Sequence, residues 1–373
     1  MLHKSSAWPL ALVYTALIVY ASLYPFADWR DQGLWPWSFL AAPWPRYWTS
    51  FDVVANALGY GPLGFLLALG VLRSQGAGRV PAWRAVVLAL VLALVLSLLL
   101  ETVQSYLPVR VPSRLDWLLN AGGALAGALL AALLERLGAM DRWSRFRARW
   151  FAPDARGALV LLCLWPAALL FPASVPLGLG QVLERLEQGL AELLADTPFL
   201  ELLPVREIEL QPMWPGTELL CVMLGVLVPL LLGYGVIRGG WRRLAFLLLT
   251  LAVGAAATAL SAGLTYGPSH AWAWLSLPVR YGLLGGGALG LLLLWLPPRA
   301  CMAFLLLALA VQLGLLNQAP EGAYFAQTLQ TWEQGRFIRF HGLAQWLGWL
   351  WPYAALLYVL ARLSSIQPLN SRA

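Results

Sequence analysis

The sequence has little charge for its length. Only 12% of its 373 residues are charged and 60% are hydrophobic, whereas a typical soluble domain is about a quarter charged and nearer half apolar. So few charged side chains cannot cover the surface of a water-soluble protein of this size. The composition therefore predicts an integral membrane protein, and it excludes a soluble enzyme, a nucleic-acid-binding module and a disordered regulator.

Lysine, cysteine and histidine are also scarce. Lys4 is the single lysine, so the net charge of +7 comes from arginines, and most of these lie in short links between apolar runs, where they orient spans. The three cysteines form no CxxC pair, and the three histidines are far apart in the sequence. This pattern favours neither a disulfide framework nor a metal site. No Walker loop or dinucleotide fingerprint is present, and the sequence names no cofactor.

Long apolar runs make up most of the chain. A membrane-spanning helix needs about 20 mostly apolar residues, and ten runs approach that length. They predict an all-α, polytopic helical bundle, in which the first run is retained because no small-residue cleavage site follows it. The run at 157–175 is the weakest, because Pro166 and Pro172 interrupt it. The ten runs are residues 8–26, 52–72, 84–107, 115–136, 157–175, 216–237, 241–263, 276–297, 300–317 and 343–363.

The arginines predict the orientation of these spans. When the N-terminus is placed inside, most basic residues fall in the inner links and most acidic residues in the outer ones. Inner loops of membrane proteins carry the excess of Lys and Arg. We therefore expect a multi-pass protein of the plasma (inner) membrane with both termini cytoplasmic. Membrane lipids are its expected partners, nucleic acid is not, and the oligomeric state is left open.

Charge and periodicity divide the chain into three parts. Residues 1–136 hold four spans, residues 137–156 form a basic cytoplasmic linker, and residues 157–373 hold a second bundle. An outer amphipathic segment lies at about 178–215, where residues 178–196 place leucines at helical spacing opposite glutamates. We interpret this stretch as a helix on the outer face that covers the ends of the spans.

Small residues recur at four-residue spacing in two of the runs. The pairs are Gly123 with Gly127 and Gly286 with Gly290. Such pairs allow two helices to approach closely. We expect them to pack helices within one chain, with dimerisation as the alternative.

Polar side chains gather at one predicted membrane level in the first part of the chain. An ionisable group inside a span is costly and marks a candidate functional site. The second span begins, the third ends and the fourth begins at the outer side, and an arginine-bearing turn joins the last two. The candidate acid/base residues are Glu101, Asp52 and Asp116, and the candidate substrate-binding residues are Arg110, Arg114, Gln104, Asn56 and Asn120.

Structural roles compete with functional ones at these positions. The segments 49–52 and 113–116 both match a capping box, in which an acid at the third helical position satisfies the start of a helix. Asn56 and Asn120 are equally suited to joining helices by hydrogen bonds. The structural and the functional interpretations both stay open for Asp52, Asp116, Asn56 and Asn120.

Glu101 is different from the other candidates. It lies about six residues, or roughly 9 Å, inside the outer end of its predicted span. It also lies toward a helix C-terminus, where negative charge is disfavoured. Its carboxyl group must be neutral or paired there, and we expect Arg110 or Arg114 to be the partner.

These residues resemble the VanZ-like membrane proteins. The shared pattern is an Asp/Asn helix with Pro-Leu-Gly, a Glu-x-x-Gln helix end, an Arg, and then Ser-x-x-Asp-x-x-x-Asn with glycines. It covers about residues 10–137 and leaves the second bundle outside. The matching residues are Ser22–Phe26, Asp52, Asn56, Gly59, Pro62–Phe65, Glu101, Gln104, Arg110, Ser113, Asp116, Asn120, Gly123 and Gly127.

The resemblance implies a cell-envelope protein whose biochemical activity is not established. The founding member is linked to low-level resistance to the glycopeptide antibiotic teicoplanin. From the residues, we expect the outer cluster to bind or modify a lipid-linked cell-wall or polysaccharide precursor, with arginines on phosphate and carboxylates as acid/base groups. The alternatives are a transporter that uses the cluster as an ion or proton site, and a structural scaffold. Whether the protein is an enzyme is left open, because no nucleophile is evident.

Overall fold

The structure is a computed structural model that describes residues 7–24, 26–33, 35–44, 49–73, 80–171, 173–202, 213–318 and 338–364. Within these ranges the side chains of residues 51, 52, 185, 188, 201, 202 and 338–343 are not described. The chain forms two compact units, Met1–Phe146 and Arg147–Ala373. The division falls within the basic segment 137–156, most of which folds as a helix.

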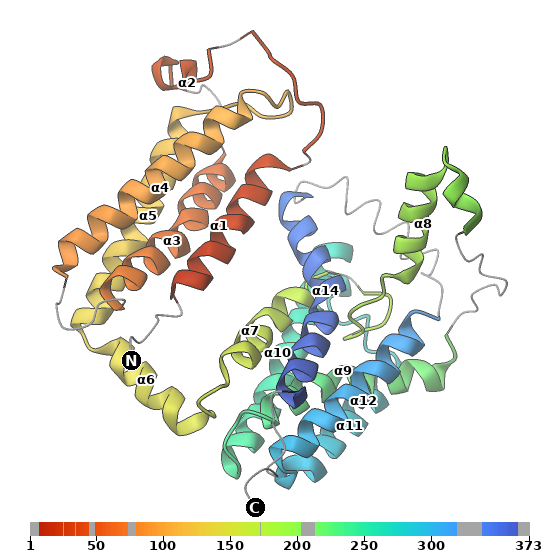
Figure 1. The fold of residues 1–373 in the computed structure, drawn as a ribbon. Helices are drawn as coiled ribbons and strands as arrows, with labels where there is room; N and C mark the ends of the chain where they lie inside the picture. Colours follow the sequence, from red (N-terminus) through yellow and green to blue (C-terminus); the bar gives the residue numbers. More distant parts are fainter. Residues whose placement is uncertain are drawn as a thin grey trace, which may run out of the picture. The chain divides into compact units, whose positions relative to one another are not determined.

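The first unit is a bundle of four long helices, α1, α3, α4 and α5, which run alongside one another (Figure 1). A short helix α2 precedes α3, and α6 follows α5 and extends four residues into the second unit. The bounds are α1 Ala7–Leu23, α2 Ser38–Ala41, α3 Ser50–Arg73, α4 Ala82–Gln104, α5 Arg114–Arg136 and α6 Ala139–Trp150.

Glycines decide how α3 and α5 pack. A Cβ atom added at Gly123 would lie 2.0 Å from the carbonyl oxygen of Ala57, and one at Gly127 would lie 1.9 Å from that of Gly61. A Cβ at Gly64 would likewise lie 2.0 Å from the carbonyl oxygen of Ala124. The two backbones therefore touch, as small-residue pairs in membrane helices permit. The expected role of the first glycine pair in packing within one chain is confirmed.

The second unit is built around α9, which is buried on all sides over residues 224–234. A helix that is apolar all round belongs in the centre of a bundle. Helices α7, α10, α11 and α12 pack against α9, and α14 packs on α7 and α12. The elements are α7 Arg156–Ala168, α8 Leu183–Leu194, η1 Pro198–Leu202, α9 Pro215–Tyr234, α10 Trp241–Tyr266, η2 Pro268–His270, α11 Leu277–Leu292, η3 Leu293–Trp295, α12 Pro298–Leu316 and α14 Ile338–Ser364.

The all-α fold class is confirmed. Within the described ranges the only β-type pairing is an isolated bridge between Phe151 and Ile237. Each of the ten apolar runs contains a helix, and seven helices in the described residues are long and apolar enough to cross a membrane. The ten spans and the cytoplasmic termini stay predictions.

Two expected helices differ in the structure. The run 157–175 is not one helix, because α7 ends at Ala168 and the described residues from 169 to 182 are non-helical and largely buried. The amphipathic helix expected at 178–196 is confirmed as α8, but it begins at Leu183. Residues 178–182 instead pack into the unit, since Gly178, Leu179 and Gly180 are buried.

Candidate functional site

The turn between α4 and α5 brings Glu101 next to the start of α5. The Oε2 atom of Glu101 accepts a hydrogen bond of 2.9 Å from the backbone N–H of Ser113, and Glu101 is only 5% exposed. Ser113 is the N-cap of α5, and its Oγ atom accepts a hydrogen bond of 3.1 Å from the N–H of Leu115. The Glu101 carboxylate therefore completes the capping of α5, whose positive dipole end favours a negative charge.

A second hydrogen bond joins the same two helices one turn deeper. Asn120 Nδ2 donates to Ser97 Oγ at 2.9 Å, and both residues are buried. Asn120 Oδ1 is also buried but has no hydrogen-bond partner among the described residues. A buried polar atom without a partner is rare, since each costs free energy. The Oδ1 atom is therefore an available acceptor within the cluster.

Two further residues lie close to Glu101. Asp116, in the first turn of α5, is near enough to interact with Glu101 electrostatically. Tyr60 of α3 is buried and is a neighbour of both Ser97 and Glu101. The polar cluster, defined here as Tyr60, Ser97, Glu101, Ser113, Asp116 and Asn120, thus draws on three helices of the first unit.

The two arginines of the turn do not pair with Glu101. No ion pair in the described part of the chain joins Glu101 to Arg110 or Arg114, so the expected pairing is wrong. The Nη2 atom of Arg110 instead donates to the carbonyl oxygens of Ala21 at 3.1 Å and Tyr24 at 2.7 Å. These carbonyls belong to the end of α1, where a cation satisfies the unpaired oxygens of a helix.

Gln104, like Arg110, donates a hydrogen bond to the end of α1. Its Nε2 atom donates to the carbonyl oxygen of Ser22 at 2.9 Å. The Gln104 and Arg110 side chains therefore tie the end of α4 and the following turn to the end of α1. This geometry gives both residues a structural role that their sequence positions did not reveal.

Arg114 has a different environment. Its guanidinium lies over the ring of Trp44, with 4.3 Å between Cζ and the ring centroid. Its Nε atom is buried and has no hydrogen-bond acceptor within the described residues. An arginine held against an aromatic ring keeps its donors in a fixed plane, which suits it to bind phosphate.

The remaining candidates are only partly described. Asn56 is half-buried in α3, and no hydrogen bond involving it is found in the described residues. Asp52 lies in the first turn of α3, but its side chain is outside the described part of the chain. The structure therefore brings Glu101, Asp116 and Asn120 together, turns Gln104 and Arg110 toward α1, and leaves the position of the Asp52 carboxylate untested.

Tyr60 and the stacking of Trp44 were not predicted as parts of the site. Tyr60 lies four residues after Asn56, so helical spacing places both on one face of α3, and this spacing could have identified it. The contact of Trp44 with Arg114 spans 70 positions of sequence, and no local pattern indicates it. Among the described residues, no group of three or more His, Cys, Asp or Glu side chains is arranged to hold a metal ion.

The long apolar helices, with a buried polar cluster at their ends, define a helical membrane protein. Residues 5–135 match the model of the VanZ/LLP1 family, so this N-terminal segment is VanZ-like. The match covers about a third of the chain and contains every residue of the polar cluster. The same comparisons found no match among curated proteins or among solved structures.

Proposed function

We propose that the VanZ-like unit binds the phosphate-bearing head group of a lipid-linked envelope precursor at the outer leaflet of the plasma membrane. The observation that carries this proposal is the polar cluster itself. Together with Arg114 at the start of α5, it brings a buried carboxylate, a buried acceptor without a donor at Asn120 and a guanidinium to one end of a membrane bundle. Ionisable and polar groups at membrane depth cost free energy, so their presence there marks a candidate functional site.

Arg114 is the proposed phosphate-binding residue. Tryptophan side chains gather at the membrane–water interface, so the Trp44 ring is suited to hold the Arg114 guanidinium at the level of lipid head groups. Guanidinium groups bind phosphate through two parallel hydrogen bonds. Arg110, which we had expected to share this role, donates to the end of α1. The proposal therefore depends on Arg114 and not on Arg110.

Glu101 and Asp116 are proposed to act on the bound head group. Two nearby carboxyl groups are suited to hold different protonation states, so that one accepts a proton while the other donates one. Asn120 Oδ1 would accept a hydrogen bond from a sugar or phosphate hydroxyl. We do not extend the proposal to glycopeptide resistance, because the second bundle has no counterpart in the family match.

A structural scaffold is the second candidate function, and one observation favours it. Glu101 accepts from a backbone N–H, and Arg110 and Gln104 donate to backbone carbonyls. Each of these contacts stabilises the bundle without any ligand. Binding data are needed to separate the two functions, since both require the same buried polar residues.

The experiment measures binding of undecaprenyl phosphate to the purified full-length chain in nanodiscs, with the neutral alcohol undecaprenol as the control ligand. We expect the phosphate to bind at least tenfold more tightly than the alcohol. Arg114→Gln should remove this preference, and Glu101→Gln should keep the fold but change the binding or turnover of the phosphate lipid. Asp52→Asn and Asp116→Asn test the two remaining carboxylates in the same way.

The chain offers a matched control for Arg114. Arg84 also lies over a tryptophan ring, that of Trp83, with 5.3 Å between Cζ and the ring centroid, but at the other end of α4. Arg84→Gln should leave the phosphate preference unchanged. Equal binding of the phosphate and the alcohol to the wild-type protein would contradict the proposed phosphate site and favour the scaffold function.

The proposed outer location of the polar cluster is tested by cysteine labelling, in a variant whose three native cysteines are replaced. Val111 is 85% exposed in the turn that carries the arginines, and Ser144 is exposed on α6. With a membrane-impermeant maleimide, Val111→Cys should react in intact cells and Ser144→Cys only after permeabilisation. The reverse pattern would place the polar cluster on the cytoplasmic side and exclude an outer-leaflet substrate.

A further inference from the structure

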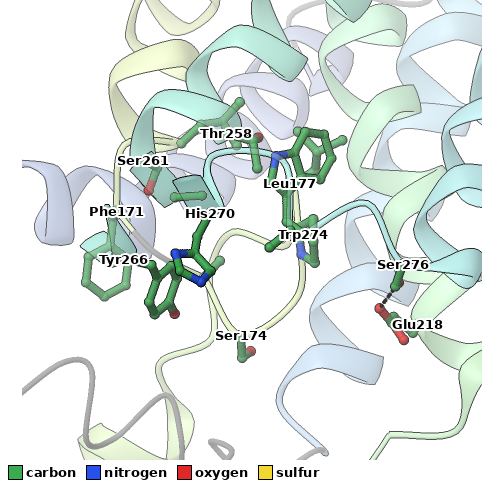
Figure 2. A pocket seen from close by; sticks show the side chains of 15 residues that line it. Phe171, Ser174, Leu177, Glu218, Thr258, Ser261, Tyr266, His270, Trp274 and Ser276 are labelled. Carbon is green, nitrogen blue, oxygen red and sulfur yellow. Dashed lines mark hydrogen bonds between the residues drawn. The ribbon is translucent and has the colours of Figure 1, made fainter. Parts of the chain in front are cut away.

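The second unit contains a cavity of about 350 Å³ (Figure 2). This volume lies within the range of small-molecule sites. The walls come from the segment after α7, the first turn of α9, the C-terminal part of α10 and the residues between α10 and α11. No residue of the VanZ-like segment contributes to it, so the cavity is independent of the polar cluster.

The first wall is a non-helical segment between α7 and α8, which includes the described residues 169–171 and 173–182. Irregular backbone at membrane depth is tolerated only where it is buried in protein or lines a cavity. Leu169, Phe171 and Leu177 of this segment are buried and line the cavity. The interruption of the fifth apolar run therefore has a structural purpose, because it builds a wall that a continuous helix could not.

Three side chains, from α10 and from α12 with its C-cap, hold the backbone of this segment. The Ser261 hydroxyl donates to the carbonyl oxygen of Leu170 at 2.9 Å, and Gln312 Nε2 donates to that of Leu177 at 3.4 Å. Asn317 reaches further along the same segment. Its Nδ2 atom donates to the carbonyl oxygen of Gly180 at 3.1 Å, and its Oδ1 atom accepts from the N–H groups of residues 182 and 183. The wall is therefore fixed in place, as a preformed binding site requires.

Backbone strain occurs at the same wall. Leu177 has φ +62°, a left-handed conformation that is an outlier for a bulky residue. It is held there because its carbonyl oxygen and side chain pack against Gly225 of α9, where an added Cβ would lie 2.6 Å from that oxygen. Strained residues persist only where the surrounding structure over-determines them, and they gather at binding sites.

The lining has the chemistry of a cation site. Glu218 is the carboxylate of the described lining residues and His270 is their imidazole, and no lysine or arginine is among them. One Glu218 oxygen accepts from Ser276 Oγ at 3.2 Å (Figure 2), and no ion pair joins Glu218 to an arginine in the described residues. A carboxylate has about four acceptor positions, so most of those of Glu218 are available.

Aromatic and neutral groups complete the lining. Phe171, Tyr266 and Trp274 present rings to the cavity (Figure 2), and aromatic faces attract cations. Thr258 belongs to the lining, and its Oγ1 atom is buried without a hydrogen-bond partner among the described residues. The described residues offer no group of three His, Cys, Asp or Glu side chains that could hold a metal ion.

We propose that this cavity binds an ammonium group, carried either by a small organic amine or by a phospholipid head group, with Glu218 opposite the charge and the aromatic rings around its carbon substituents. This site lies outside the VanZ-like segment and is a second binding function of the chain. It needs neither the polar cluster nor a lipid-linked phosphate. A failure of one proposal therefore leaves the other intact.

The first experiment measures calorimetric binding of choline to the full-length chain in maltoside micelles. The comparison ligand is 3,3-dimethyl-1-butanol, which has the shape of choline without the charge. We expect choline to bind at least tenfold more tightly than the alcohol. Glu218→Gln should weaken choline binding at least tenfold and leave the alcohol unchanged, since the amide oxygen still accepts from Ser276. Glu192→Gln, which removes an exposed carboxylate from α8, is the matched control and should change neither ligand.

A second variant tests whether the ligand binds in this cavity, without altering the charge of the protein. Ala273 lines the cavity and is exposed, so Ala273→Phe should fill the site, with little effect on thermal unfolding, and abolish binding of both ligands. Equal affinities of wild-type protein for choline and the alcohol would overturn the charge argument. Unchanged choline binding in Glu218→Gln or Ala273→Phe would overturn the assignment to this cavity.

Reconstitution distinguishes between a lipid head group and a soluble amine as the source of the ammonium group. Nanodiscs of phosphatidylglycerol are compared with nanodiscs that also contain phosphatidylethanolamine. If a lipid head group occupies the cavity, the second lipid should be retained by the wild-type protein in native mass spectrometry, lost in Glu218→Gln, and should compete with choline. Choline binding without such competition assigns the site to a soluble amine. Absence of both choline binding and lipid retention would overturn the proposal.

Discussion

Both units of this chain use polar side chains to satisfy backbone groups at helix ends, and the second unit also uses one to hold a non-helical segment. In the first unit, Glu101, Gln104 and Arg110 bind backbone groups where helices begin and end. In the second unit, Arg243 is 4% exposed and does the same with four carbonyl groups, while Asn317 holds a non-helical segment. The carbonyls that accept from Arg243 belong to Tyr234, Ile237, Leu294 and Leu296.

A buried charge in a membrane bundle does not by itself mark a binding site. Arg110 and Arg243 are both buried, and both are occupied by carbonyl oxygens at helix ends. Asn120 Oδ1 and Thr258 Oγ1, by contrast, have no hydrogen-bond partner among the described residues. A buried polar residue is therefore better assessed from the partners of its individual atoms than from its burial alone.

The largest expected effect is a loss of folding when glycines at the close helix–helix contacts of each unit are replaced. Gly127→Ala in the first unit should abolish folding of the VanZ-like bundle, because the new Cβ would lie 1.9 Å from the backbone oxygen of Gly61 and α3 must move away. Gly286→Ala in the second unit should do less, since the nearest atom, at 2.9 Å, is the Val226 side-chain Cβ. The measurement is the yield of monodisperse protein by size-exclusion chromatography in detergent.

Gly122 provides the control for this prediction. No heavy atom lies within 4 Å of a Cβ at Gly122, and alanine is the better helix former. Gly122→Ala should therefore express as well as the wild-type protein. If Gly127→Ala were equally well behaved, backbone contact between α3 and α5 would not be what holds the first unit together.

The next effect compares the two buried arginines. Arg243→Met should lower the free energy of unfolding by at least about 3 kcal/mol, since each hydrogen bond from a charged group contributes roughly 1.5–3 kcal/mol. Arg110→Met removes the hydrogen bonds to Ala21 and Tyr24 and should lower the free energy of unfolding by at least about 1.5 kcal/mol. The readout is the midpoint of thermal unfolding in detergent. Arg243→Lys should recover only part of the loss, because an ammonium group lacks the planar fork, and full recovery would mean that charge alone matters.

A smaller effect compares the two residues that accept from backbone N–H groups. Asn317→Leu leaves the N–H groups of residues 182 and 183 without their acceptor, while Glu101→Leu leaves only that of Ser113. Each such group costs about 1–3 kcal/mol when it stays buried, so Asn317→Leu should be the more destabilising. Hydrogen–deuterium exchange should also rise at residues 178–183 in Asn317→Leu.

The control for this pair is Glu101→Gln. The amide oxygen can still accept from Ser113, so stability should change by less than about 1 kcal/mol. A large loss of stability in Glu101→Gln would show that the bundle needs the charge of Glu101 rather than its hydrogen bond. That outcome would favour the scaffold over the binding site.

The smallest effect compares two N-caps. Ser113→Ala removes a hydrogen bond of 3.1 Å at the start of α5 and should cost about 1 kcal/mol. Ser276→Ala removes a longer N-cap bond of 3.5 Å at the start of α11, together with the exposed hydrogen bond from Ser276 to Glu218, and should cost less than Ser113→Ala. Differential scanning fluorimetry of both variants gives the ranking. Ser113→Thr, which keeps an oxygen at the N-cap, should restore most of the stability, and an opposite ranking would mean that the longer bond contributes more.

Much of the fold follows from local features of the sequence. Each of the ten apolar runs contains a helix, because length and hydrophobicity are properties of a continuous stretch. The meeting of Glu101, Asp116 and Asn120 was also predictable, since a short turn between two antiparallel helices must bring the end of one to the start of the next. The glycine pair of α5 indicated a close contact for the same reason, because spacing of four places both residues on one helix face.

Only the tertiary structure decided the partners of these residues. The sequence predicted Arg110 or Arg114 for Glu101, because opposite charges nearby in sequence attract, yet the carboxylate accepts from a backbone group and Arg110 reaches α1, more than 80 positions away. The broken helix after Ala168 and the cavity beside it depend on Gln312 and Asn317, which lie about 135 positions further along. Local composition determines which segments enter the membrane. Hydrogen bonds between distant segments determine where the backbone can leave the helix, because a buried N–H or C=O group needs a partner wherever the fold provides one.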